Sequence, residues 1–73
     1  MKLPVVSGAQ AVKAFAKMGY LVDRQRGSHI ILREAGAPHR RLCIPNHPEL
    51  AKGALRALIK EAGLSVDQFT RLL

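Results

Sequence analysis

A histidine follows a tight-turn signal in the first half of the chain. Gly27-Ser28-His29 comes directly after the basic run Arg24-Gln25-Arg26 and before an apolar run, so His29 is expected between two strands. An imidazole titrates near neutral pH and can accept or donate a proton. Beside guanidinium cations, it suits acid–base chemistry on an anionic substrate. A half-buried, hydrogen-bonded strand histidine is the alternative, and the local sequence alone favours that alternative.

The charge of the chain narrows its possible partners. The 73 residues include 12 Lys and Arg against 5 Asp and Glu, which gives a formal charge of +7. The cations are spread from Lys2 to Arg71, so we expect one small domain over residues 1–73 with a basic surface and no basic tail. Nucleic acid is the default partner of such a surface. An anionic membrane or an acidic protein would satisfy the same charge.

A second group of cations recurs at helical spacing. Lys52, Arg56 and Lys60 lie four residues apart, where like charges on a helix repel by a few tenths of a kcal/mol per pair, roughly. A solvated helix face explains them. They also suit phosphate binding, because Lys52 and Arg56 fall in the amino-terminal half of the predicted helix, where its amides and dipole favour anions. Both interpretations stay open at this point.

Other reactive side chains point to no further chemistry. Cys43 is the only cysteine, which excludes an internal disulfide and favours the cytosol. His39, Cys43 and His47 are evenly spaced but lack an evident fourth ligand, so we expect no metal and no cofactor. His47 is a weak candidate for a substrate contact. No apolar run is long enough for a signal peptide or a membrane span, so we expect a soluble cytoplasmic protein.

Start and stop signals divide the chain into six elements. Ser7 with Gln10, and Ser65 with Gln68, have capping-box spacing and predict two helix starts. The first helix should end near Met18, the last should run from Ser65 to the end, and a third covers 51–62. Strands are predicted over 20–26, 29–33 and 40–44, with turns at Gly27 and over 35–38. The order predicts an α+β domain, with an antiparallel three-stranded sheet covered by helices on one face.

Several segments in register carry a resemblance to a known family. They are Gly27-Ser28-His29, the strand end Ile44-Pro45-Asn46-His47, the run from Lys52 to Leu64, Leu3-Pro4 with Ser7-Gly8, and the step Gly19-Tyr20. Over essentially the full chain, these segments resemble the HicA toxins. The resemblance implies a fold like the double-stranded-RNA-binding domain, an endoribonuclease (mRNA interferase) activity and a HicB antitoxin as partner. It also implies that His29 is catalytic.

The chemistry of RNA cleavage fits one histidine and a basic surface. RNA supplies its own nucleophile, the 2′-hydroxyl, so no metal is required in principle, and His29 would act as base or as acid. The candidate RNA contacts are Arg24, Arg26, Ser28, Lys52, Arg56 and Lys60, although a serine after glycine in a hairpin is more often only a turn residue. A non-catalytic RNA-binding module is the alternative. A purely protein-binding subunit is a third interpretation.

Overall fold

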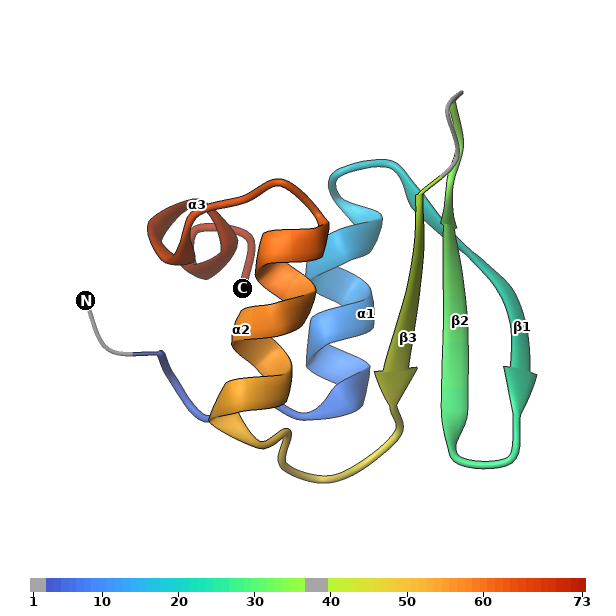
Figure 1. Ribbon diagram of the computed structural model, residues 1–73, viewed down its shortest axis with the longest axis horizontal. Coiled ribbons are helices and arrows are strands. Elements are labelled where there is room, and N and C mark those ends of the chain that lie inside the picture. The colour runs from blue at the N-terminus through green and yellow to red at the C-terminus, as the bar shows by residue number, and fades with distance from the viewer. Residues whose placement is uncertain (1–2, 37–39) are drawn as a thin grey trace.

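The computed structural model describes residues 3–36 and 40–73, which form three helices and one three-stranded sheet (Figure 1). The elements are α1 (Gly8–Ala16), β1 (Tyr20–Arg26), β2 (His29–Glu34), β3 (Arg41–Pro45), α2 (Lys52–Glu61) and α3 (Val66–Thr70). Their order confirms the predicted α+β arrangement of the double-stranded-RNA-binding type. The predicted turn over 35–38 extends beyond the described residues.

The first helix begins where its capping box predicts. The Ser7 hydroxyl accepts from the Gln10 main-chain N–H at 3.0 Å, and the Gln10 side chain accepts from the Ser7 N–H at 2.9 Å. The helix ends at Ala16, two residues before the predicted end. There the N–H groups of the next turn bond three residues back, as from Gly19 to Ala16 at 3.0 Å, and Gly19 takes a φ of 102°.

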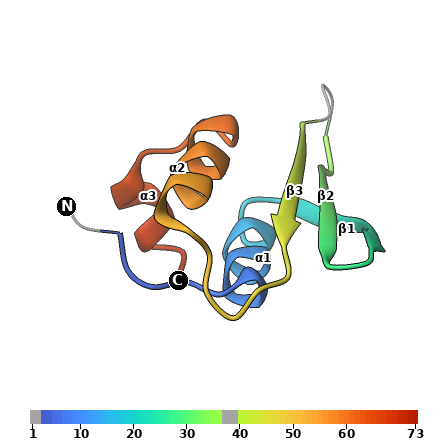
Figure 2. The ribbon, with the colours of Figure 1, turned by 60° about the horizontal axis from the view of Figure 1, so that its bottom comes forward.

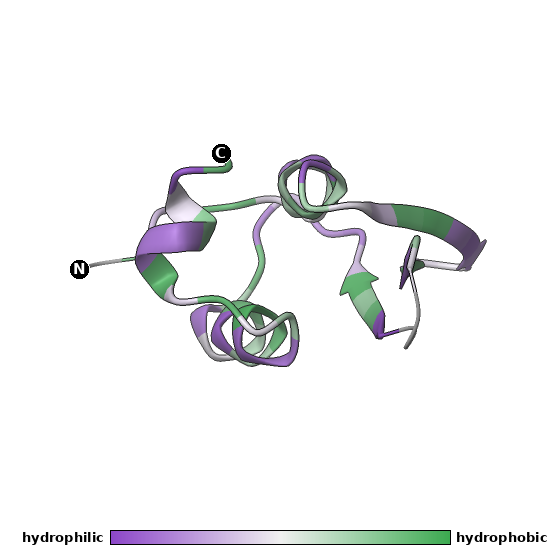
Figure 3. Ribbon diagram, turned by 90° about the horizontal axis from the view of Figure 1, so that it is seen from above, coloured by the Kyte–Doolittle hydropathy of each residue, from purple (hydrophilic) through white to green (hydrophobic). Residues whose placement is uncertain are grey.

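Antiparallel pairing in the order β1-β2-β3 gives the sheet two different faces. Leu32 pairs with Leu42, and Ile30 with Ile44; these side chains point toward the helices, where three of them are fully buried. Viewed from below and from above, all three helices lie on this one side of the sheet (Figures 2 and 3). The opposite face carries no covering element within the described part of the chain.

Aromatic rings join the helices to the sheet. Phe15 of α1 lies with its ring centroid 5.9 Å from that of Tyr20 and 5.2 Å from that of Phe69, and all three side chains are buried. Phe69 reaches this position because α3 starts at the predicted capping box, in which Ser65 and Gln68 exchange hydrogen bonds. The short last helix therefore completes the core, although it ends at Thr70, before the predicted end.

The middle helix buries its apolar stripe and exposes its cations. Leu55, Leu58 and Ile59 of α2 are buried, and the helix contacts β3 and α3. Ala51 takes the N-cap position but provides no side-chain hydrogen bond, so the first amides of α2 have no side-chain cap there. The predicted helix over 51–62 is confirmed, with its two outermost residues serving as caps.

Candidate nucleic-acid interface

The β1–β2 turn places His29 at the first position of β2. Gly27 takes a φ of 57°, a conformation that glycine adopts without steric cost, and this permits the two-residue turn. In the sheet register His29 stands directly opposite Arg26 on β1 and Pro45 on β3. Its side chain is exposed. The structure therefore does not support the alternative of a half-buried strand histidine.

Hydrogen bonds tie this turn to the end of β3 and to α1. The Asn46 N–H donates to the Ser28 carbonyl at 2.6 Å, and the Gly8 N–H at the start of α1 donates to the His47 carbonyl at 2.9 Å. A side chain at Gly8 would collide with the Pro45 carbonyl, so glycine is required for this approach. The turn, the β3–α2 loop and the first residues of α1 and α2 consequently share one end of the molecule (Figure 1).

Cross-strand partners define the surface around His29, because residues opposite each other in a sheet point to the same side. Three rows lie on the side away from the helices. We call this surface the open face; its rows are Arg26, His29 and Pro45, then Arg24, Ile31 and Cys43, then Leu21, Arg33 and Arg41. None of these residues is buried. Four guanidinium groups and one imidazole thus share one side of the sheet.

The structure brings some of the predicted RNA contacts together and separates others. Arg24 and Arg26 share the open face with His29, and Lys52 begins α2 at the same end of the molecule as His29. Arg56 and Lys60 follow on α2, about 6 and 12 Å further along the helix axis at 1.5 Å per residue. Both are exposed. Lys60 therefore lies toward the end of α2 remote from Lys52.

Residues 8–64 match the family model described as the HicA toxin of bacterial toxin–antitoxin systems. The chain belongs to the HicA toxin family. The match begins with α1 and continues beyond α2, so it includes the whole sheet, His29 and the cations of α2. This HicA chain is accordingly a toxin of a toxin–antitoxin pair. Comparison with curated proteins and with solved structures gave no match.

The six candidate RNA contacts named from the sequence do not include two members of the open face of this HicA chain. Arg33 and Arg41 stand directly opposite each other on β2 and β3, on the same side as His29. Strand alternation would have found them, because His29, Ile31 and Arg33 are two residues apart and must share a face. Leu42 is apolar and is therefore expected to face the core, so its neighbour Arg41 is expected on the opposite face of the sheet.

Two other reactive side chains of the HicA chain, Cys43 and His47, lie within the described residues. Cys43 is a free, exposed thiol in the middle row of the open face, and His47 is exposed in the loop after β3. His39, the third member of the set weighed as metal ligands, lies outside the described residues. Within residues 3–36 and 40–73, no three His, Cys, Asp or Glu side chains are grouped as metal ligands.

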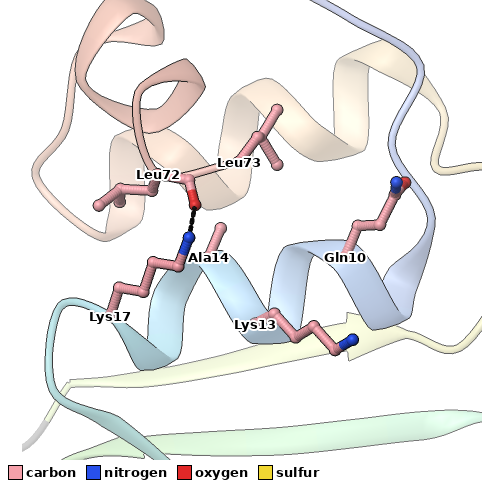
Figure 4. Close-up of a pocket in the computed structure, with 6 residues that line it drawn as sticks. All are labelled: Gln10, Lys13, Ala14, Lys17, Leu72 and Leu73. Atoms are coloured by element: carbon pink, nitrogen blue, oxygen red, sulfur yellow. Dashed lines mark hydrogen bonds between the residues drawn. The ribbon is translucent and has the colours of Figure 1, made fainter.

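A groove of about 170 Å³ lies between α1 and the carboxy-terminal segment (Figure 4). Its lining residues are Gln10, Lys13, Ala14, Lys17, Leu72 and Leu73, and Lys17 Nζ donates to the Leu72 carbonyl at 2.8 Å. None of these residues belongs to the open face. The groove therefore plays no part in the site around His29.

No helix in the described part of the HicA chain is long and apolar enough to cross a membrane.

Proposed function

We propose that this toxin is an endoribonuclease that binds and cleaves mRNA, and that His29 transfers the proton. The observation that carries the proposal is the pairing of His29 with Arg26 on an exposed sheet face. The pairing puts a group that can exchange a proton beside a permanent cation, where a phosphodiester can reach both. RNA cleavage needs these two functions, proton transfer and stabilisation of charge on the phosphate.

The proposed reaction uses the nucleophile that RNA carries. The 2′-oxygen attacks the neighbouring phosphorus, the bond from phosphorus to the 5′-oxygen breaks, and the products are a 2′,3′-cyclic phosphate and a 5′-hydroxyl. His29 accepts the 2′-proton as a base or protonates the leaving 5′-oxygen as an acid, and water serves the other step. Arg26 stabilises the negative charge that develops on the phosphate oxygens. The reaction in this form requires no metal ion.

Contacts outside the reacting group hold the RNA. In this proposal Arg24 on the open face, Ser28 in the turn and the cations of α2, beginning with Lys52, bind neighbouring phosphates. Arg56 and Lys60 extend these contacts along α2. The first amides of α2 lack a side-chain cap, which adds positive potential beside Lys52.

The same exposure that admits RNA makes the site easy to cover. The proposed antitoxin is a HicB-like protein that lies over the end of the sheet, blocks His29 and presents acidic groups to the arginines. In the cytoplasm, where we place the pair, release of the antitoxin would expose a site that needs no cofactor. A complex that leaves His29 open and still cleaves RNA would contradict this part of the proposal.

The test compares His29→Ala with His47→Ala. Both variants remove an exposed imidazole, but only His29 stands opposite Arg26 on the open face, whereas His47 lies in the loop after β3. A labelled mRNA is incubated with each purified protein with and without a chelator, and RNA binding and thermal unfolding are measured alongside. We expect His29→Ala to lose cleavage while it keeps binding and fold, and His47→Ala to cut like the wild type in either buffer.

Two results would overturn the proposal. If the wild type binds RNA without cutting it, the chain is a non-catalytic RNA-binding module. If His29→Ala cuts as fast as His47→Ala, the chain is a nuclease that does not use His29. Analysis of the product ends provides a separate check, because 2′-oxygen attack leaves a 5′-hydroxyl and not a 5′-phosphate.

A further inference from the structure

We infer that Arg33 and Arg41 bind phosphates of the RNA beyond the cleavage point, so that the open face holds a short unpaired segment by its backbone. The inference rests on the proposed function and adds to it two residues and a substrate class. In the row of the open face farthest from His29, Arg33 of β2 stands opposite Arg41 of β3.

Two arginines in directly opposite positions are energetically costly. Side chains directly opposite each other on neighbouring strands have Cβ atoms about 4.5–5.5 Å apart, and like charges in such positions destabilise the sheet. No carboxylate of the described residues lies within ion-pair distance of Arg33 or Arg41. The Nε of Arg33 is itself buried, so a ligand on this face would meet the terminal nitrogens of the guanidinium group. A phosphate bound between the two guanidinium groups would relieve the repulsion and supply acceptors.

A neighbouring arginine shows the contrast. Arg40 precedes Arg41 in the chain, yet its Nε lies 3.5 Å from the Glu34 carboxylate, and its guanidinium lies where a side chain on Gly63 would be. Arg40 therefore has a structural partner at the end of the sheet. Arg41 has no such partner in the described part of the chain, so its charge is available to a ligand.

The dimensions of the open face indicate which form of RNA fits. Adjacent strands are about 4.8 Å apart and alternate residues about 6.6 Å, so the three rows span roughly 10 by 13 Å. Double-stranded-RNA-binding domains contact about 16 base pairs, far more than this area covers. Attack by the 2′-oxygen in line with the leaving oxygen also requires a backbone that departs from the A-form helix. Both considerations favour a short unpaired segment.

The side chains of the open face indicate how that segment is recognised. Stacking of bases on a sheet requires exposed aromatic rings, and the nine residues of the open face include none. The uncharged side chains there are Leu21, Ile31, Cys43 and Pro45. Recognition on this face therefore acts on phosphates, which carry no sequence information, and tolerates many sequences.

The test measures RNA binding in the His29→Ala background, so that the RNA stays intact. The double variant Arg33→Gln/Arg41→Gln is compared with Lys13→Gln/Arg71→Gln, which removes the same charge from two exposed positions of the helical side. The probes are a labelled unpaired oligoribonucleotide and a duplex containing the same strand. Each phosphate contact to a single strand adds about 0.7 to the slope of log affinity against log salt, roughly fourfold in affinity at 0.15 M salt.

We expect the arginine variant to lose about 1.4 from that slope and roughly fifteenfold in affinity for the unpaired strand, and the control variant to lose neither. The conservative variant Arg33→Lys/Arg41→Lys should keep the slope, which separates charge from folding. Equal slopes in the two glutamine variants would overturn the inference. A variant that lost only its binding to the antitoxin would also overturn it. So would tighter binding of the wild type to the duplex than to the unpaired strand, with the same loss of affinity in the arginine variant.

Failure of the proposed function would give a different result from failure of this inference. Binding to the open face is measured in protein that cannot cleave, whereas catalysis is measured with His29 in place. A chain that never cuts RNA can therefore still pass the binding test, and a chain that cuts can fail it.

Discussion

The Asn46 main-chain N–H donates to the carbonyl of Ser28 at 2.6 Å, one residue beyond the last paired positions of β2 and β3. This bond fixes the β1–β2 turn against the β3–α2 loop. His29 follows Ser28 directly, so its backbone is held on one side by the sheet and on the other by this bond. The loop thereby contributes to the geometry of the proposed site without supplying a reacting group.

Substitution of Asn46 by proline tests that role. Proline has no N–H, so Asn46→Pro removes the bond to Ser28, whereas Asn46→Ala keeps it. A hydrogen bond of this kind contributes about 1 kcal/mol to the free energy of unfolding. In urea unfolding and single-turnover cleavage, we expect Asn46→Pro to lose about that stability and to lower the cleavage rate more than RNA affinity. Equal behaviour of the two variants would show that the bond does not position His29.

A pair of glycine variants tests the contact between α1 and the end of β3. At Gly8 an added Cβ would collide with the Pro45 carbonyl and crowd the backbone of Asn46, neither of which can yield like a flexible side chain. At Gly53 in α2 nothing lies within 4 Å. We expect Gly8→Ala to lose about 1–3 kcal/mol of stability through overpacking. Gly53→Ala should gain up to about 1 kcal/mol, because alanine favours a helix.

The two alanine variants also separate stability from activity. Gly8→Ala should displace the segment from Pro45 to His47 and reduce cleavage even in the fraction that remains folded. Circular dichroism at increasing urea gives the stability, and cleavage is measured where both proteins are fully folded. If Gly8→Ala matched the stability and rate of Gly53→Ala, the close approach of α1 to Pro45 would have no energetic importance.

The phenol of Tyr20 predicts a loss of stability at alkaline pH. Burial raises the pKa of Tyr20, and the negative charge of Glu34 acts in the same direction. In the unfolded chain the phenol ionises near pH 10. Above that pH the folded state binds more protons at this position than the unfolded state, so the free energy of unfolding falls as pH rises.

Tyr20→Phe removes the ionisable group and keeps the ring beside Phe15. In urea unfolding between pH 7 and 11, we expect the variant to lose less stability than the wild type above about pH 10. The difference between the two proteins isolates Tyr20 from the lysines that titrate in the same range. Parallel curves for the two proteins would contradict the prediction.

Much of this fold could be predicted because its signals are local. The capping boxes at Ser7 and Ser65 mark helix starts through hydrogen bonds between residues three apart, and both form. The signals that set the helix ends are less local. The first helix stops at Ala16 because the following turn tightens toward Gly19, whereas apolar spacing alone would carry the helix to Met18. Val12, Phe15 and Ala16 have the spacing of one apolar helix face, although Ala16 is exposed in the structure.

The candidate site could be predicted only where sequence neighbours are also neighbours in space. His29 and Arg26 are three residues apart across one turn, so the sequence places them together. Arg33 and Arg41 meet through the register of β2 and β3, which no local pattern specifies. The reverse holds for Lys60, which helical spacing groups with Lys52 although about 12 Å of helix separates them.

Among residues 3–36 and 40–73, the strand order leaves one long side of β1 without a partner, and exposed apolar side chains lie near it at Leu21 and Val22. Such an edge invites pairing with a second molecule, which leads to aggregation. Here the edge strand carries Arg24 and Arg26 and a bulge after Val22, and charges and bulges are features that oppose such pairing. The positive charge of the sheet therefore also opposes contact between two toxin molecules through this face, and it favours a covering surface of opposite charge.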